Sequence, residues 1–290
     1  SYGAIHIKAL RALIYQSRSR MNKLFPIVLV FVSLLFFSHT RKDTSDCALT
    51  NNAFSSGEEI IYQTSYNWGF IWLDAGEVTF KVEKDEYKGN PCYKLSGIGG
   101  TYPSYDWIYK VRDRFECWVD TSTLKPYRYL RDVQEGGRFF YNECFFNFNK
   151  LKAYCVTKEK EKMPRLDTVP ITPCAFDPLT MIYYSRTIDF SKYKPNDTIP
   201  ISLFLDNNVY SLYLRYLGKE KFTLDDKNTF NCIKFSPLLV EGTIFKGGEG
   251  MTVWATDDKN RIPIYVEAPI IVGSVKAKII KWKGLKNKWE

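Results

Sequence analysis

The chain has 290 residues, 45% of them hydrophobic and 16% aromatic, and this composition excludes a largely disordered protein and favours strands over helices. The formal net charge is +9, but residues 1–40 hold five basic and no acidic side chains, which leaves 36 basic against 32 acidic residues, or +4, for the rest. Without a polycationic body, the chain loses the main reason to expect nucleic-acid binding.

The first elements in chain order are typical of an export signal. Met21 is followed by one basic residue, Lys23, and then by an apolar run from Leu24 to Phe37. A run of about 14 residues is too short to span a bilayer comfortably and matches the apolar core of a signal peptide. We therefore expect a signal-peptide helix over residues 21–40.

Three further expectations follow for the N-terminal region. Residues 1–20, which precede the first methionine, are interpreted as upstream translation, and residues 41–54 as a flexible mature N-terminus. Cys47 offers a lipidation site, although Asp46 stands where a lipoprotein has a small residue. An uncleaved membrane anchor or a buried helix remains the alternative to a cleaved signal peptide.

The segment from about residue 55 to residue 160 has a β pattern. "GEVTFKVEKDEYKGNPCYKLSG" alternates apolar and polar residues, turns at residues 88–90 and returns, as a hairpin does. "KVRDRFECWVDTSTLKPYRYLRDV" alternates in the same way and breaks at residues 120–123. These patterns predict successive antiparallel strands.

One pair of cysteines has the spacing of a cross-strand disulfide. "ECFFNFNKLKAYCV" indicates a hairpin that turns at Asn149 and Lys150, and this register places Cys144 opposite Cys155. The alternatives are two reduced thiols or a shifted register. Cys174 and Cys232 form a second conceivable pair. The seven cysteines include no CxxC motif, so a zinc ribbon or a thioredoxin-type site is not expected.

The predicted helix follows a charged, proline-bearing loop. In "DPLTMIYYSRTIDF", Asp177 suits the N-cap and Pro178 the first turn, and the apolar residues that follow have helical spacing. We expect a helix over residues 178–188. The β pattern then returns over about 195–285, with a hairpin turn at residues 206–208.

These elements predict a mainly β fold. We expect a single domain over residues 55–285, built as a strongly curved antiparallel sheet, a β-sandwich or a half-barrel, and closed by the one short helix. The alternative is two similar lobes flanking that helix.

Most catalytic designs are missing from the chain. The only histidines, His6 and His39, lie in the leader or at its edge, so Ser-His-Asp, Cys-His and histidine-zinc sites are not expected in the processed protein. We predict no cofactor and no metal site. A glycosidase-type carboxylate pair remains conceivable, but no two acids are marked as partners. The sequence "DDKN" at residues 257–260 is interpreted as a turn.

A ligand-binding face is the leading interpretation of the aromatic and arginine residues. Aromatic rings stack on sugars or line apolar cavities, and arginines hold anionic groups. Core filling and structural Arg–carboxylate pairs are the competing explanations. The candidate ligand-binding residues are Trp68, Trp72, Tyr105, Trp107, Arg112, Arg114 and Arg186.

Five segments together resemble a known family. They are "GEEIIYQTSYNWGFIWLDAGEVTF", "YDWIYKVRDRFECWVDTSTLKPYRY", "FDPLTMIYYSRTIDF", "IKFSPLLVEG" and "DDKNRIPIYVEAPIIVGSVKAKI". Together they are similar, over about residues 55–285, to the exported bacterial proteins called domain of unknown function 3108. The resemblance implies export to the periplasm or cell envelope of a Gram-negative bacterium and a mostly antiparallel β fold. No catalytic residue carries over, because none is established for that family.

We therefore expect an exported protein of the periplasm or outer membrane, without enzymatic activity, that binds an amphipathic or glycan ligand or a partner protein. The expected partners are a lipid, a glycan or an envelope protein, with no nucleic acid and no transmembrane span in the mature chain. A carboxylate-dependent polysaccharide hydrolase and a structural or assembly protein of the envelope are the alternative functions.

Overall fold

The computed structural model describes residues 49–289 except 69–70, 225–226, 241–246 and 271–272. The described residues belong to one compact unit, Ser45–Glu290. The signal peptide, the upstream segment and Cys47 lie outside them, so the expectations for these parts stay predictions. Within the described residues, no helix is both long enough and apolar enough to cross a membrane.

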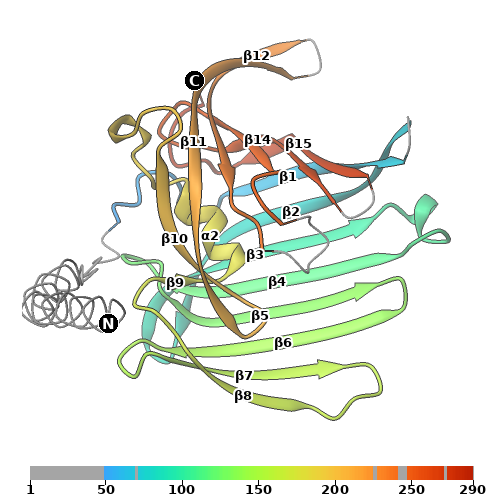
Figure 1. The fold of residues 1–290 in the computed structure, drawn as a ribbon, viewed down its shortest axis with the longest axis vertical. Helices are drawn as coiled ribbons and strands as arrows, with labels where there is room; N and C mark the ends of the chain where they lie inside the picture. Colours follow the sequence, from blue (N-terminus) through green and yellow to red (C-terminus); the bar gives the residue numbers. More distant parts are fainter. Residues whose placement is uncertain (1–48, 69–70, 225–226, 241–246, 271–272, 290) are drawn as a thin grey trace, which may run out of the picture. The chain divides into compact units, whose positions relative to one another are not determined.

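All strands of the described part belong to one sheet (Figure 1). They are β1 Glu59–Trp68, β2 Ile71–Tyr87, β3 Asn90–Thr101, β4 Val111–Asp120, β5 Pro126–Glu135, β6 Arg138–Asn147, β7 Lys152–Glu159, β8 Arg165–Pro170, β9 Ala175–Phe176, β10 Thr198–Leu205, β11 Asn208–Leu224, β12 Asn228–Pro237, β13 Thr252–Thr256, β14 Pro263–Pro269 and β15 Ser274–Lys283. The order across the sheet runs from β8 down to β1, then from β15 down to β9. Every neighbouring pair is antiparallel except β9 with β10.

The sheet corrects part of the expected architecture. Its fifteen strands form one continuous ladder, so the described residues do not form the two stacked sheets of a sandwich. The two end strands, β8 and β9, are not paired with each other, and the sheet is neither closed nor strongly curled. The reason is the pairing of β1 with β15, which joins the two β blocks edge to edge.

Helix α2, Pro178–Ser185, begins where its sequence predicts. The side chain of Asp177 accepts hydrogen bonds from the backbone N–H groups of Leu179 and Thr180, both at 3.0 Å, as an N-cap does. The helix is three residues shorter than the expected 178–188. It stops because the side-chain hydroxyls of Ser185 and Thr187 donate to backbone carbonyls of the last turn.

The core lies where α2 and the β10–β11 hairpin pack on one face of β2 to β7. Leu179 of the helix packs with Leu95 of β3 and Leu203 of β10. Further toward β8, Phe204 of β10 packs with the cysteines of β6 and β7. Figure 1 shows β10 and β11 running across the strands from β3 to β6, with α2 beside them.

The N-terminal end of the described chain is packed at residues 53 and 54, and the expectation of a flexible segment over residues 41–54 stays a prediction. Ala53 and Phe54 are completely buried in the same core, and the Phe54 ring contacts the Tyr183 ring edge-on. Residues 41–48 lie outside the described part. The buried side chains of Ala53 and Phe54 therefore anchor a stretch that has no strand pattern of its own.

The local hairpin predictions agree with the structure. The turn between β2 and β3 consists of Lys88 and Gly89, and that between β10 and β11 of Asp206 and Asn207, all with positive φ. Positive φ at both central residues gives the turn twist that suits two-residue hairpins. These turns fix which side chains of each strand face the core.

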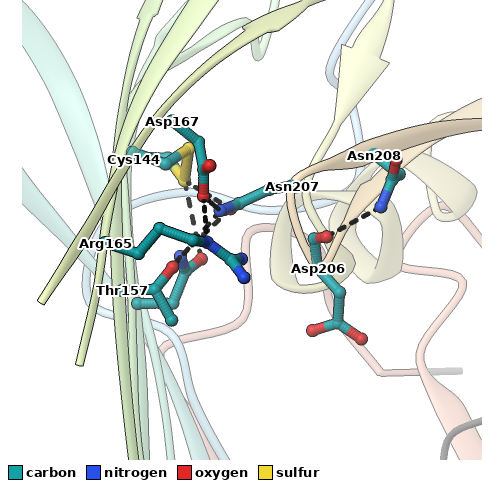
Figure 2. Close-up of a disulfide and its surroundings, with 9 residues drawn as sticks. Cys144, Thr157, Arg165, Asp167, Asp206, Asn207 and Asn208 are labelled. Carbon is teal, nitrogen blue, oxygen red and sulfur yellow. Dashed lines mark hydrogen bonds and ion pairs between the residues drawn. A yellow bond between two sulfur atoms is a disulfide. The ribbon is translucent and has the colours of Figure 1, made fainter. Parts of the chain in front are cut away.

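Cys144 and Cys155 are register partners of β6 and β7 and form a disulfide, with an S–S distance of 2.07 Å (Figure 2). The loop between the strands spans four residues, and its last residue, Leu151, has a φ of +49°. Cys232 is a free, buried thiol, so it does not pair with Cys174.

Candidate functional site

Exposed apolar side chains collect on the loops at one end of the sheet. Strands β3, β5 and β7 point the same way, so the loops that follow them emerge at the same end, on the right in Figure 1. We call the following residues of these loops and their flanks the tip surface: Trp107, Ile108, Tyr109, Phe139, Met163 and Leu166.

Three of these residues are the most exposed large hydrophobic side chains in the described part of the chain. Trp107 is 83% exposed, Met163 89% and Leu166 77%. Single exposed apolar residues are ordinary on a protein surface, but here several lie on three loops at the same end of the sheet, and concentrations of exposed apolar residues mark interaction sites. Folding gains almost nothing from side chains this exposed, so the tip surface calls for a functional explanation.

The loop that carries Trp107 is braced by an arginine. The 3₁₀ turn η1, Pro103–Tyr105, leads to Asp106, whose carboxylate accepts two hydrogen bonds from Arg112, at 2.6 and 3.0 Å. Thr101 also donates to this carboxylate, at 2.7 Å. The hydrogen bonds from Arg112 and Thr101 hold the pKa of Asp106 below its usual range. The fork of Arg112 thus fixes the backbone next to Trp107.

A second brace ties this loop to the β5–β6 turn. The N–H of Gly136 donates to the carbonyl of Lys110 at 2.9 Å, and the ring of Tyr109 lies against Gly136. A Cβ at Gly136 would approach this ring to 2.3 Å, and its φ of +53° disfavours other residues. Two of the three tips are therefore held in a fixed relation.

Basic residues surround the apolar tips. Segments 102–112, 135–139 and 158–166 hold seven basic residues against four acidic ones. Lys162 pairs with Glu159 and Arg165 with Asp167. Lys110, Arg138 and Lys160 are exposed and have no ion-pair partner within the described residues.

An acidic pair lies beside the braced tips. Asp113 of β4 and Glu135 of β5 are near neighbours, because Asp113 is paired with Val133 and Glu135 with Val111. Burial and, next, the negative charge of Glu135 raise the pKa of Asp113 to about 7. The backbone N–H of Gln134 donates to Asp113 at 3.2 Å. This carboxyl can exchange a proton near neutral pH.

Several of the sequence-predicted ligand residues meet at this end. Trp107 is part of the tip surface, Tyr105 is half-buried in η1 beneath it, and Arg112 braces its loop. Trp72 starts β2 at the same end, 39% exposed, with the Lys276 ammonium 3.7 Å from its ring centroid.

Trp68 is the last residue of β1, at the same end of the sheet as Trp72. Its side chain lies outside the described part of the chain. Arg114 lies apart from the tips and forms ion pairs with Glu116 and Asp132, both at 3.1 Å. Both ion-pair partners of the Arg114 guanidinium are therefore side chains of the sheet.

Arg186 is placed in the core rather than in a cleft. It is 2% exposed and forms a two-pronged ion pair with Glu58, at 2.6 and 2.9 Å. Its remaining N–H groups donate to the carbonyls of Asn260 and Ala53. Burial alone would lower the pKa of Arg186, but the hydrogen bonds to Glu58 raise it overall. Arg186 therefore joins three parts of the chain.

The stretch "DDKN" is a turn in the structure. The carboxylate of Asp258 accepts hydrogen bonds from the backbone N–H groups of Asn260 and Arg261, both at 3.0 Å. Asp257 pairs with Lys219 at 2.7 Å. Asn260 is fully buried and bonds to the backbone of Asn287, so the turn holds the end of the chain.

A polar recess lies beside the disulfide (Figure 2). It is open, has a volume of about 520 Å³ and is lined by β8 and the β10–β11 turn. Within it, the amide of Asn207 donates to Asp167 at 2.7 Å and to Thr157 at 3.2 Å, and accepts from Asn142 at 3.1 Å. The Cys144 sulfur lies 3.6 Å from the Asn207 oxygen, a contact without a proton because that sulfur is disulfide-bonded.

The contacts in the recess are best explained as structural, because they attach the β10–β11 hairpin to other strands of the sheet. Asn207 saturates its amide with strand residues, and Arg131 of β5 pairs with Asp206 at 2.8 Å. These contacts attach the turn of the β10–β11 hairpin to strands β5 to β8. The groups around Asn207 are already engaged in this docking.

The free thiol of Cys117 lies in a closed, polar environment. The Cys117 thiol donates to Asp177 at 3.0 Å and receives a hydrogen bond from Thr180, but all three side chains are buried. Burial and then the charge of Asp177 raise the pKa of Cys117 well above its usual value. No group of three or more His, Cys, Asp or Glu residues in this part of the chain could hold a metal ion.

Reasoning from the sequence missed most of the tip surface. Ile108 and Phe139 lie in the segment with the predicted β pattern, and Met163 and Leu166 lie in the charged loop that follows it, so the sequence pattern does not single them out. A signal was available at Met163 and Leu166, which follow Lys162 and Arg165 in the charged loop, where no core-forming strand is expected. Glu135, the neighbour of Asp113, was likewise not singled out.

Comparison with known proteins places the chain in a family. Residues 61–280 match the family model described as "Protein of unknown function (DUF3108)". The chain belongs to the DUF3108 family. The resemblance inferred from the sequence is confirmed, and it extends across nearly all of the sheet. No curated protein matches this DUF3108 chain.

A solved structure shares the fold of this DUF3108 protein. It is titled "Crystal Structure of Beta-barrel-like Protein of Domain of Unknown Function DUF1849 from Brucella abortus". The match has a TM-score of 0.52 at 11% identity and covers 78% of this chain and 96% of that chain. At this identity the likeness concerns the fold alone.

Proposed function

We propose that this protein is exported to the periplasm or outer membrane of a Gram-negative bacterium and binds an amphipathic partner there, without catalysis, through its tip surface. The observation that carries the proposal is the combination of an 83% exposed Trp107 with a rigidly braced loop. A side chain left in water on a fixed backbone costs little ordering entropy when a partner covers it.

Export is supported by two features of the chain. The apolar run from Leu24 to Phe37 follows a basic residue, as in signal peptides. The disulfide between Cys144 and Cys155 is the chemistry of an oxidising compartment.

Native mass spectrometry of the protein purified from envelope extracts tests the binding proposal. We expect a co-purifying amphipathic molecule on the wild-type chain that is lost from Trp107→Ala. The matched control is Trp282→Ala, which removes a 40% exposed tryptophan from β15. Equal retention by both variants would contradict the proposal, as would a wild-type protein that carries no such molecule and also binds no envelope lipid.

A second candidate function rests on Asp113. A carboxyl with a pKa of about 7 beside a second acid suits the general acid of a polysaccharide hydrolase. Reducing-sugar release from envelope polysaccharides by the wild type, abolished in Asp113→Asn, would favour this function. If the wild type releases no reducing sugar, the hydrolase function is excluded.

A further inference from the structure

We propose that the partner of the tip surface is the headgroup region of an anionic lipid bilayer, an inference that rests on the binding function proposed above. The occupant is a membrane surface rather than a small ligand or a groove-bound peptide. Three observations lead to this choice: the distribution of the apolar residues over separate loops, their chemical types, and the surrounding charge.

The apolar residues of the tip surface lie outside the polar recess. They come from the β3–β4 loop, the β5–β6 turn and the region around the β7–β8 turn, and none of them borders the polar recess. A small ligand on one loop would leave the other two in water. A broad, soft surface can cover all three loops at once, because they emerge from the same end of the sheet (Figure 1).

The residue types suit the depth profile of an interface. Trp107 and Tyr109 combine an apolar ring with a polar group, the pattern that settles at the headgroup level. Ile108 and Met163 are purely apolar and would enter the acyl boundary. The lysines beside them carry long apolar stems that let the ammonium groups stay at the surface.

The charge balance selects an anionic surface. The three tip segments hold seven basic and four acidic residues, and Lys110, Arg138 and Lys160 are not neutralised by an ion pair within the described residues. Each basic residue near an anionic bilayer adds to the electrostatic attraction. This attraction weakens with salt, which gives the inference a second observable.

Vesicle sedimentation of the protein in its exported form tests this inference. The probes are phosphatidylglycerol vesicles and phosphatidylcholine vesicles, each at low and high salt. The tip variant is Trp107→Ser with Met163→Ser. The control variant is Leu151→Ser with Ile280→Ser, which removes two apolar residues, 42% and 43% exposed, from the opposite end of the sheet.

We expect the wild type and the control variant to sediment with phosphatidylglycerol vesicles, more weakly with phosphatidylcholine and at high salt. The tip variant should bind phosphatidylglycerol vesicles at least about tenfold more weakly than the wild type does. Only protein from which the leader has been removed is compared, because an apolar leader would itself bind vesicles and mask the contribution of the tips. Equal binding of the tip and control variants would overturn the inference.

These experiments distinguish a failure of the lipid-surface inference from a failure of the binding function. A wild-type protein that ignores both vesicle types, yet carries a glycan or protein lost with Trp107, would refute the lipid surface and leave the binding function standing. A wild-type protein that binds neither vesicles nor any molecule from envelope extracts would refute both.

Discussion

At the scale of single residues, the ion pair of Glu58 and Arg186 holds together segments that are far apart in sequence. The two residues are separated by 128 positions, and both are completely or almost completely buried. Two charges in the core are tolerated because the guanidinium is also bonded to Asn260 and Ala53. Removing one partner leaves the other charge without compensation.

We therefore predict that Glu58→Gln lowers the free energy of unfolding by about 3–5 kcal/mol, measured by urea denaturation. Glu59→Gln is the matched control, since Glu59 pairs only with the surface residues Lys81 and Lys283, and it should leave the urea midpoint nearly unchanged. If Glu58→Gln does not fold, Glu58→Met with Arg186→Met should recover stability. Equal midpoints for the two single variants would show that the pair does not stabilise the core.

Asp113 gives a prediction about pH. Its folded-state pKa of about 7 lies above that of an unfolded aspartate, about 4, so the folded protein keeps a proton that the unfolded chain releases. Stability therefore falls as the pH rises from about 4 through 7. Asp113→Asn removes this loss and should be more stable than the wild type at pH 8, by on the order of 1 kcal/mol after solvent screening.

At pH 4 the Asn variant and the wild type should have similar stability, because Asp113 is then protonated in the folded state and no longer charged. Thermal unfolding across this pH range measures the difference. Glu135→Gln is the companion variant, since removing the neighbouring charge should lower the pKa of Asp113 and shrink the window. A stability difference that does not change between pH 4 and pH 8 would contradict this account.

At the scale of elements, the β10–β11 hairpin is attached by its turn. Asn207 has a φ of +56° and directs its amide to Thr157 and Asp167 (Figure 2). We predict that Asn207→Gly, which keeps the turn conformation but removes the side chain, destabilises the protein by about 1–3 kcal/mol in urea.

The neighbouring Asn208 provides the control for this prediction. Its amide donates only to the Asp206 carbonyl, at an exposed position. Asn208→Ala should therefore cost clearly less than Asn207→Gly. If the two variants cost the same, the turn is not docked through the Asn207 side chain.

Local elements were predictable because their causes are local. The Lys88–Gly89 turn, the pairing of Cys144 with Cys155 and the N-cap of Asp177 all depend on residues within a dozen positions. The ion-pair partner of Arg186, in contrast, could not be predicted, because Glu58 lies 128 residues away. Such a partner has no local signature.

The residues of the candidate site were likewise predictable only where the local sequence marks them. Trp107 and Arg112 were found, because aromatic and arginine residues stand out in a β pattern. The role of Arg112 as the brace of Asp106 was not visible, since it depends on how the β3–β4 loop folds back. Met163 and Leu166 were missed because their exposure is decided by the position of the β7–β8 turn.

At the scale of the whole described unit, pairing β1 with β15 produces a single sheet with two different ends. The ladder order was not predictable, since alternation marks strands but does not say which strands pair. The core, the disulfide and the docked hairpin lie along its inner strands, whereas the tip surface occupies the loops after β3, β5 and β7. Stability and binding are thus assigned to different parts of the molecule.

Hydrogen exchange measured by mass spectrometry, with and without lipids extracted from the cell envelope, tests this assignment most directly. The account predicts slower exchange in residues 102–110 and 136–139 when the lipids are present, with residues 206–209 at the polar recess unchanged. Protection confined to the recess, or no protection at the tips, would contradict it.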